Sequence, residues 1–241
     1  MSPLELVRHV SPTVGQAGAA FYFDPATLAK GKELGLDGFR FYMLGRGGVL
    51  GDVESDVIVS AFGYFHPGLV AKIWGSAKEV MEPREAGRVY MDCAASYGTA
   101  HLGGIEGLPA FNAAAEKVSA AVDRSALPLF AGVAAEPKSD EPAARAMQNL
   151  AVLRELRGSV HLLAVAAQGL SAEMAHRIKR PDDVKTFGYE AGVEPSDADR
   201  AKWEAAEELT DQLLCAPYSV LDDTEAAALV AVVDAVAETL G

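Results

Sequence analysis

The sequence predicts an all-α protein, or one nearly so, and three observations lead to this prediction. A helix-opening pattern recurs along the chain: an N-cap residue followed closely by a proline, as at Asp24 and Pro25. Apolar residues in the final stretch, 224–240, repeat at intervals of three and four. Evidence for strands is thin, because the β-branched run VIVSAFGYF, residues 57–65, lacks sustained alternation and has no hairpin turn beside it. We therefore expect about ten helices.

The helix signals follow one another along the first half of the chain. The segment after Asp24 is expected to be helical through Leu34, and Gly35 then ends it. Proline and glycine separate the next four helical segments, which we place at residues 53–65, 66–77, 77–98 and 109–124.

The second half follows the same pattern. Asp140, two residues before a proline, opens a helix that reaches about Arg157, and Thr224 opens the last one. The polar stretch AAEPKSDEP between the halves is the predicted domain boundary. We expect two helical bundles, an N-terminal one over residues 1–137 and a C-terminal one over residues 138–241.

Charge is distributed unevenly and excludes some functions. The chain has 241 residues, of which 50% are hydrophobic and 23% charged, so it can fold around a large core. Residues 181–241 hold 15 of the 34 acidic residues but only 3 of the 21 basic ones. Nucleic acid is therefore not an expected partner. No apolar run is long enough to cross a membrane and no secretory leader is visible, so we expect a cytoplasmic protein.

The sequence contains few signs of a metal site or a bound cofactor. Cys93 and Cys215 lie far apart without a CxxC pair, and both are expected to be reduced core residues. The chain has no HExxH or GxSxG motif, and its five histidines are scattered. We predict no metal site, and the sequence identifies no cofactor.

The stretch RGSVHLLAV, residues 157–165, places an arginine and a histidine in an apolar setting. If residues 143–168 form one helix, with at most a kink at Gly158, four polar residues fall on one stripe: Arg154, Arg157, His161 and Gln168. One interpretation is structural, with Arg157 pairing with an acidic segment and His161 satisfied in the core. The other is that the stripe faces a pocket for a small molecule.

Two further segments are candidates for the walls of such a pocket. In FGYFHPGL, residues 62–69, the side chains of Tyr64, Phe65 and His66 either pack in the core or line a cavity, and His66 is expected at a helix start. The glycine-rich FYMLGRGGVLGDV, residues 41–53, lacks the pattern of a phosphate-binding loop. Its glycines are expected to let two helices approach closely, with Arg46 anchoring the loop or reaching into the same cavity.

These segments together resemble the SalK/EvbL-like family of actinobacterial proteins over most of the chain. The resemblance rests on the YFDP entry, the RGGVLG loop, and the blocks LPLFAG, VLRELRGSVHLLAVAAQGL and EELTDQLLCAPY. It implies a mostly helical protein with a helix-turn-helix segment, whose C-terminal part derives from a winged-helix-like domain. It also implies that five residues occupy recurrent family positions: Arg46, Arg157, His161, Thr210 and Asp211.

The chain departs from this family in two places. A histidine that the family often has before its entry motif is replaced by Gly18, which bears on any shared catalytic pair. The interval that would hold the recognition helix and wing is reduced to the acidic residues 181–209. A DNA reader needs exposed side chains that reach base edges, flanked by cations. The shortened interval offers neither.

We expect a soluble small-molecule-binding or accessory protein with a pocket between the bundles. Arg46, Arg157 and His161 would contact an anionic ligand such as a carboxylate or phosphate, and Tyr64, Phe65 and His66 would line the pocket. One alternative is an enzyme that uses His161 as general acid or base. Another is a diverged helix-turn-helix transcription regulator. The final helix either closes the core or presents a homodimer face.

Overall fold

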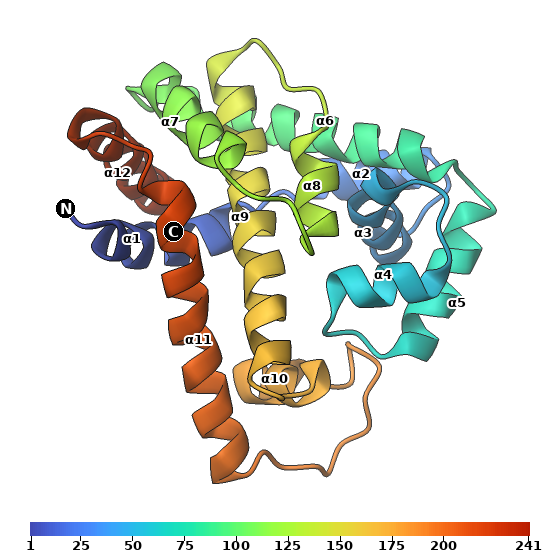
Figure 1. Ribbon diagram of the computed structural model, residues 1–241. Coiled ribbons are helices and arrows are strands. Elements are labelled where there is room, and N and C mark those ends of the chain that lie inside the picture. Colours follow the sequence, from blue (N-terminus) through green and yellow to red (C-terminus); the bar gives the residue numbers. More distant parts are fainter.

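The computed structural model describes residues 1–241. All of its regular secondary structure is helical, and it contains no strand (Figure 1). The all-α prediction is confirmed. There are twelve α-helices and two short 3-10 helices, in the order α1 (Pro3–Ala17), α2 (Pro25–Glu33), α3 (Gly38–Gly47), η1 (Gly48–Leu50), α4 (Ser55–Phe62), α5 (Pro67–Lys78), α6 (Pro83–Leu102), α7 (Leu108–Ala120), α8 (Pro128–Ala134), α9 (Pro142–Ala167), α10 (Ala172–Lys179), η2 (Pro181–Asp183), α11 (Asp197–Tyr218) and α12 (Asp223–Leu240).

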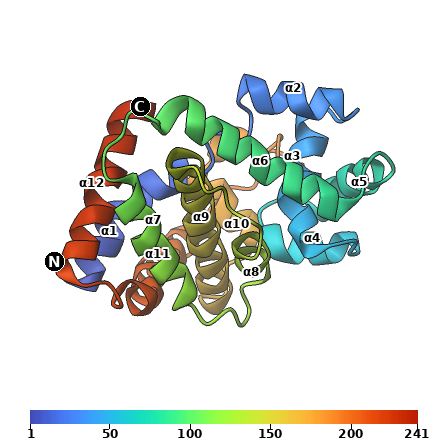
Figure 2. The ribbon, with the colours of Figure 1, turned by 90° about the horizontal axis from the view of Figure 1, so that it is seen from above.

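The long helix α9 is the axis of the molecule. It packs against α1, α6, α7, α8 and α11, and Figure 2 looks along it with these helices arranged around it. Its first half is buried on almost every side, which explains why a sequence rich in alanine and leucine carries no clear polar face there. The helix passes through Gly158 and ends at Ala167, so the expected end near Arg157 is wrong by about three turns.

Polar side chains cap the N-terminus of most of the helices, as the sequence predicts. Asp24 accepts from the backbone N–H of Ala26 at the start of α2, and Gly35 follows the helix with a φ of 80°. Two predicted starts move slightly. Asp222, in a capping box, opens α12 in place of Thr224, and Glu141 caps α9 in place of Asp140.

The apolar core is continuous across the predicted domain boundary. One cluster of 50 buried residues draws on α1 at one end of the chain and on α12 at the other. The inner face of α12, with Leu229, Val232, Val233 and Val236, is buried in this cluster. The final helix therefore closes the core of its own chain. A homodimer and the division at residue 137 stay predictions.

The glycine-rich segment formed by the end of α3 and by η1 makes a close helix contact, as predicted. A Cβ at Gly48 would lie 1.9 Å from the carbonyl oxygen of Pro83, at the start of α6. A Cβ at Gly45 would lie 2.5 Å from the ring of Tyr90, also on α6. Only glycine permits this approach, which presses α3 and η1 against α6. No helix of the chain is both long and apolar enough to span a membrane.

These contacts predict opposite effects for two glycine substitutions. Gly48→Ala forces backbone apart and should lower the free energy of unfolding by about 1–3 kcal/mol. Gly158→Ala, in the middle of α9 with open space around it, should raise that free energy by about 0.5–1 kcal/mol. Urea unfolding followed by circular dichroism measures both. Equal effects of the two substitutions would contradict the close contact at Gly48.

Candidate functional site

Arg46 and Glu155 form an ion pair in the interior. The Arg46 Nε and Nη2 atoms each donate to one oxygen of Glu155 at 2.8 Å, and Nη1 donates to the Tyr42 hydroxyl at 3.1 Å. The Glu155 side chain is only 2% exposed. Tyr22 and Arg154 also donate to its Oε1 atom, at 2.7 and 2.9 Å. We call these five residues the ion cluster, which joins α3 and the turn after α1 to the middle of α9.

The partners of Glu155 hold it in the charged state. Burial alone would raise the pKa of this carboxyl, but Arg46, Arg154 and the Tyr22 hydroxyl outweigh burial and lower the pKa to about 2. Arg46 and Arg154 face a single carboxylate, so the ion cluster carries one excess positive charge. All three nitrogens of the Arg46 guanidinium already have partners. The structure therefore places Arg46 in an anchoring role, as one of the two predictions for this residue stated.

His161 lies two turns further along α9, at its contact with α11. Its Nδ1 atom is 2.9 Å from the hydroxyl of Thr210. That hydroxyl donates to the Ala206 carbonyl at 2.6 Å, so it accepts from His161, whose proton therefore sits on Nδ1. Glu207 lies alongside, 3.8 Å from the Nε2 atom, and accepts from Arg157 at 2.7 Å. We call Tyr64, Arg157, His161, Glu207 and Thr210 the His161 cluster.

Three buried polar atoms of the His161 cluster have no hydrogen-bond partner. They are the Tyr64 hydroxyl, the Arg157 Nε atom and the His161 Nε2 atom. The ring of Tyr64 is 6.5 Å from that of His161 and nearly parallel to it. Unpaired buried polar atoms are uncommon because each costs about 1–3 kcal/mol. Three in one cluster mark this place as a candidate binding site.

The unpaired atoms offer two donors and one acceptor. The pKa of His161 is lowered to about 4, chiefly by burial; Glu207 opposes this effect, and the neighbouring cations Arg157 and Lys179 add to it. Burial also raises the pKa of Tyr64 well above its usual value. At neutral pH the imidazole is therefore uncharged with a free lone pair on Nε2, and the phenol keeps its proton.

The other predicted site residues lie elsewhere. Phe65 is buried and stacks on Phe187, with ring centroids 4.2 Å apart. His66 is exposed and caps α5, where its Nδ1 atom accepts from the N–H of Gly68 at 3.1 Å. Its predicted place at a helix start is confirmed. Of the segment at residues 62–69, the structure brings only Tyr64 to His161.

Sequence reasoning missed Glu155 and Glu207, which organise the two clusters. Glu155 stands between two arginines in the run LRELRG, and a lone acid in an apolar helix is a signal for a buried ion pair. Glu207 lies on α11, in the acidic interval 181–209, where no helix was expected from the sequence. Ser196 and Asp199 form a capping box there, and this sequence signal could have predicted the start of that helix. No group of three or more histidine, cysteine, aspartate or glutamate side chains is placed to hold a metal ion.

Comparison with known proteins identifies the class. The model of a helix-turn-helix family matches residues 7–193, about three quarters of the chain, and the chain belongs to this family. The match ends before α11, so Glu207, Thr210 and Asp211 lie outside it. No curated protein and no solved structure matches the chain.

The low pKa of His161 makes stability depend on pH. The folded pKa of about 4 lies below the ordinary histidine pKa of 6.5, so the unfolded chain binds the proton more readily. The stabilising effect is complete above about pH 6.5, declines as pH falls and is lost near pH 4, for a total of about 3 kcal/mol. Urea unfolding of the wild type should therefore give a lower free energy at about pH 5 than at about pH 7.

In His161→Gln this decline should be smaller, because the titrating group is gone. His176, whose pKa burial also lowers, stays in both proteins and contributes equally to each. An identical decline in the wild type and in His161→Gln would contradict the neutral, buried imidazole.

Proposed function

We propose that the chain binds a small organic molecule at the His161 cluster, and that the ligand carries an acceptor-rich anionic group together with a hydrogen-bond donor. The observation behind the proposal is the set of three unpaired atoms. Tyr64 and the Nε of Arg157 would donate to a carboxylate or phosphate of the ligand, and His161 Nε2 would accept from its donor. The excess positive charge of the ion cluster, two turns away, favours an anion.

Entry to the site involves Trp203 of α11. The indole ring lies edge-on to the imidazole of His161, with centroids 4.9 Å apart, and is itself partly exposed. Because this partly exposed ring lies against the imidazole, a ligand would reach His161 on this side once Trp203 moves aside. The small apolar cluster beneath it contains only five buried residues, which makes this end of the molecule the easier part to open.

Binding fits the observations better than acid–base catalysis does. A general base works best when its pKa lies near the working pH, and the pKa of His161 is about 4. The finer family assignment, to SalK/EvbL-like proteins with a C-terminal part derived from a winged helix, belongs to the same proposal. The RGSVH block supports it, since its arginine and histidine are the residues of this cluster.

Tyr64→Phe tests the proposal most directly. Removing an unpaired hydroxyl should leave the free energy of unfolding unchanged or raise it slightly, while affinity for the ligand falls about tenfold or more. Native mass spectrometry of freshly purified protein identifies a retained ligand, and a thermal-shift panel of small organic acids measures affinity. Tyr97→Phe, on α6, is the matched control and should change neither property.

Two results would contradict the binding proposal. One is the absence of any retained ligand together with the absence of any stabilising acid in the panel. The other is a ligand whose affinity is the same for the wild type, Tyr64→Phe and His161→Gln. Turnover of a bound ligand that stops in His161→Gln, while binding persists, would favour the enzyme instead.

DNA binding is the second candidate, because the family is described as helix-turn-helix. The net charge of −13 opposes it. We expect no binding of a fluorescent DNA duplex at about 50 mM salt, where phosphate contacts are strongest, as measured by anisotropy. Binding that weakens steeply as salt increases would establish the regulator instead.

A further inference from the structure

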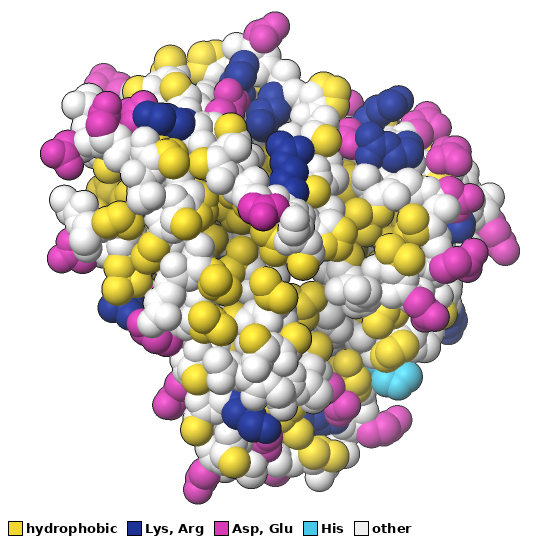
Figure 3. Space-filling model, viewed as in Figure 1, with side chains coloured by type: hydrophobic (Ala, Val, Ile, Leu, Met, Phe, Trp, Pro, Cys, Tyr) yellow, Lys and Arg dark blue, Asp and Glu magenta, His cyan; other side chains and the backbone are white.

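A polar cavity of about 380 Å³ opens where the ends of three helices meet, far from the His161 cluster. It lies between the C-terminal ends of α7 and α8 and the first turns of α9, and Figure 3 shows dark blue side chains gathered over this part of the face. Arg145, in its wall, precedes His161 by 16 residues on α9, or about 24 Å. The cavity is therefore a separate site, independent of the function proposed above.

Cations outnumber anions in the cavity wall. Arg145 is neutralised by Glu116, to which it donates two hydrogen bonds of 2.7 and 2.8 Å. Arg124 and Lys138 have no carboxylate within 4 Å. Lys138 is partly buried, and burial lowers the pKa of its ammonium; Glu116 opposes this effect, and Arg145 and Arg124 add to it. Two cations that form no ion pair of their own, beside a third that does, favour an anionic ligand.

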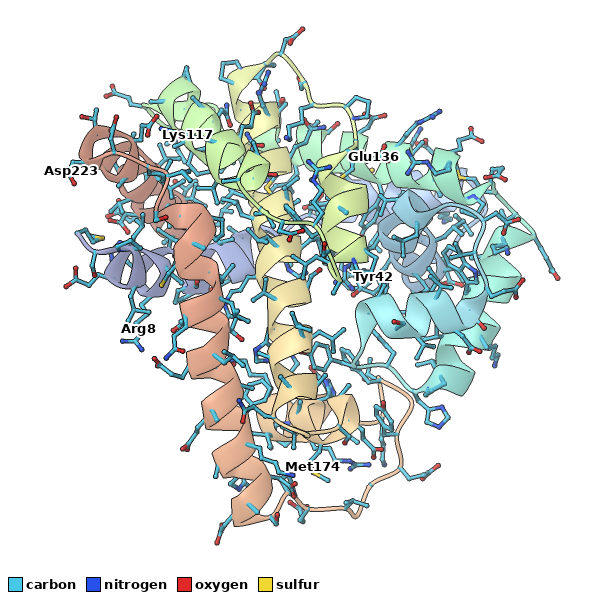
Figure 4. The ribbon with its side chains drawn as sticks, in the orientation of Figure 1. Arg8, Tyr42, Lys117, Glu136, Met174 and Asp223 are labelled. Carbon is cyan, nitrogen blue, oxygen red and sulfur yellow. The ribbon has the colours of Figure 1, made fainter.

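The cavity also contains an acceptor. The Glu136 side chain is 1% exposed, and Figure 4 labels it beside α8. Arg84 forms an ion pair with its Oε1 atom at 2.8 Å, and no aligned hydrogen-bond donor reaches either carboxylate oxygen. An ionised carboxylate can only accept. A ligand carboxylate or a fully ionised sulfate would only repel the Glu136 carboxylate. A monoprotonated phosphate, in contrast, has an O–H that can donate to it.

We propose that this cavity binds a phosphate that keeps one proton, either inorganic phosphate or a phosphate monoester. Arg124 and Lys138 bind the phosphate oxygens, and the hydroxyl of Ser119, which lines the same wall, donates to a third. The O–H of the phosphate donates to Glu136. The Glu136 oxygens are shielded from solvent, and the long side chains of Arg84 and Lys138 rotate to admit the ligand.

Discrimination between phosphate and sulfate tests this assignment. Calorimetric titration of the full chain at about pH 6, with ionic strength held constant by chloride, should show saturable binding of inorganic phosphate and at least tenfold weaker binding of sulfate. A parallel titration with glycerol phosphate distinguishes a phosphate monoester from inorganic phosphate as the ligand. Tighter binding of the monoester identifies an organic phosphate, and tighter binding of the inorganic ion identifies free phosphate.

Three variants locate the binding. Lys138→Met and Arg124→Gln should each weaken phosphate binding at least tenfold. Lys117→Met, which removes a cation of α7 labelled in Figure 4 and paired with Glu225, should not change it. Glu136→Gln supplies an N–H donor and should bring the affinities for phosphate and sulfate together.

Equal affinity for phosphate and sulfate in the wild type would overturn the proposal, as would phosphate binding that survives both Lys138→Met and Arg124→Gln. A DNA duplex that binds and is lost in Lys138→Met would also overturn it, because a phosphodiester has no proton for Glu136. Should Glu136→Gln fail to fold, the two cation variants at the cavity surface still decide the question.

Discussion

The buried carboxylate of Glu155 is the constraint on which the rest of the structure depends. A charge in the middle of a helix core is stable only when hydrogen-bonding partners surround it. Arg46 arrives from α3 and Tyr22 from the turn after α1, so the ion cluster joins the first quarter of the chain to α9. Loss of either partner would take hydrogen bonds away from a buried carboxylate, which is more costly than the loss of a surface pair.

The same helix carries the two candidate sites at different heights. Its first turns contribute Arg145 to the phosphate cavity, its middle holds the ion cluster, and its last turns present His161 to α11. Both titrating groups in its second half are buried, but their charge states differ. Glu155 has charged partners and stays ionised, whereas His161 has one carboxylate neighbour offset by two cations and stays neutral.

The acidity of the last third of the chain is used in part within the molecule. Acidic residues of α11 and α12 pair with basic residues far away in sequence, as Glu207 does with Arg157 and Glu225 with Lys117. Arg8 of α1, labelled in Figure 4, is bound by both Glu208 and Asp211. These pairs fasten α11 and α12 to a core that the rest of the chain builds. Residues 181–241 are therefore acidic in part because residues 1–180 present cations to them.

Local chemistry determined the helices, and long-range packing decided the sites. Helix starts such as Asp24 and His66 depend on hydrogen bonds within three residues, so the sequence by itself predicted them. The glycines at the end of α3 and in η1 likewise predicted a close helix contact. The pairing of Arg46 with Glu155 joins residues 109 positions apart, and the phosphate cavity exists only where three helix ends meet. No sequence spacing contains that information, because only the tertiary fold brings those side chains within reach of one another.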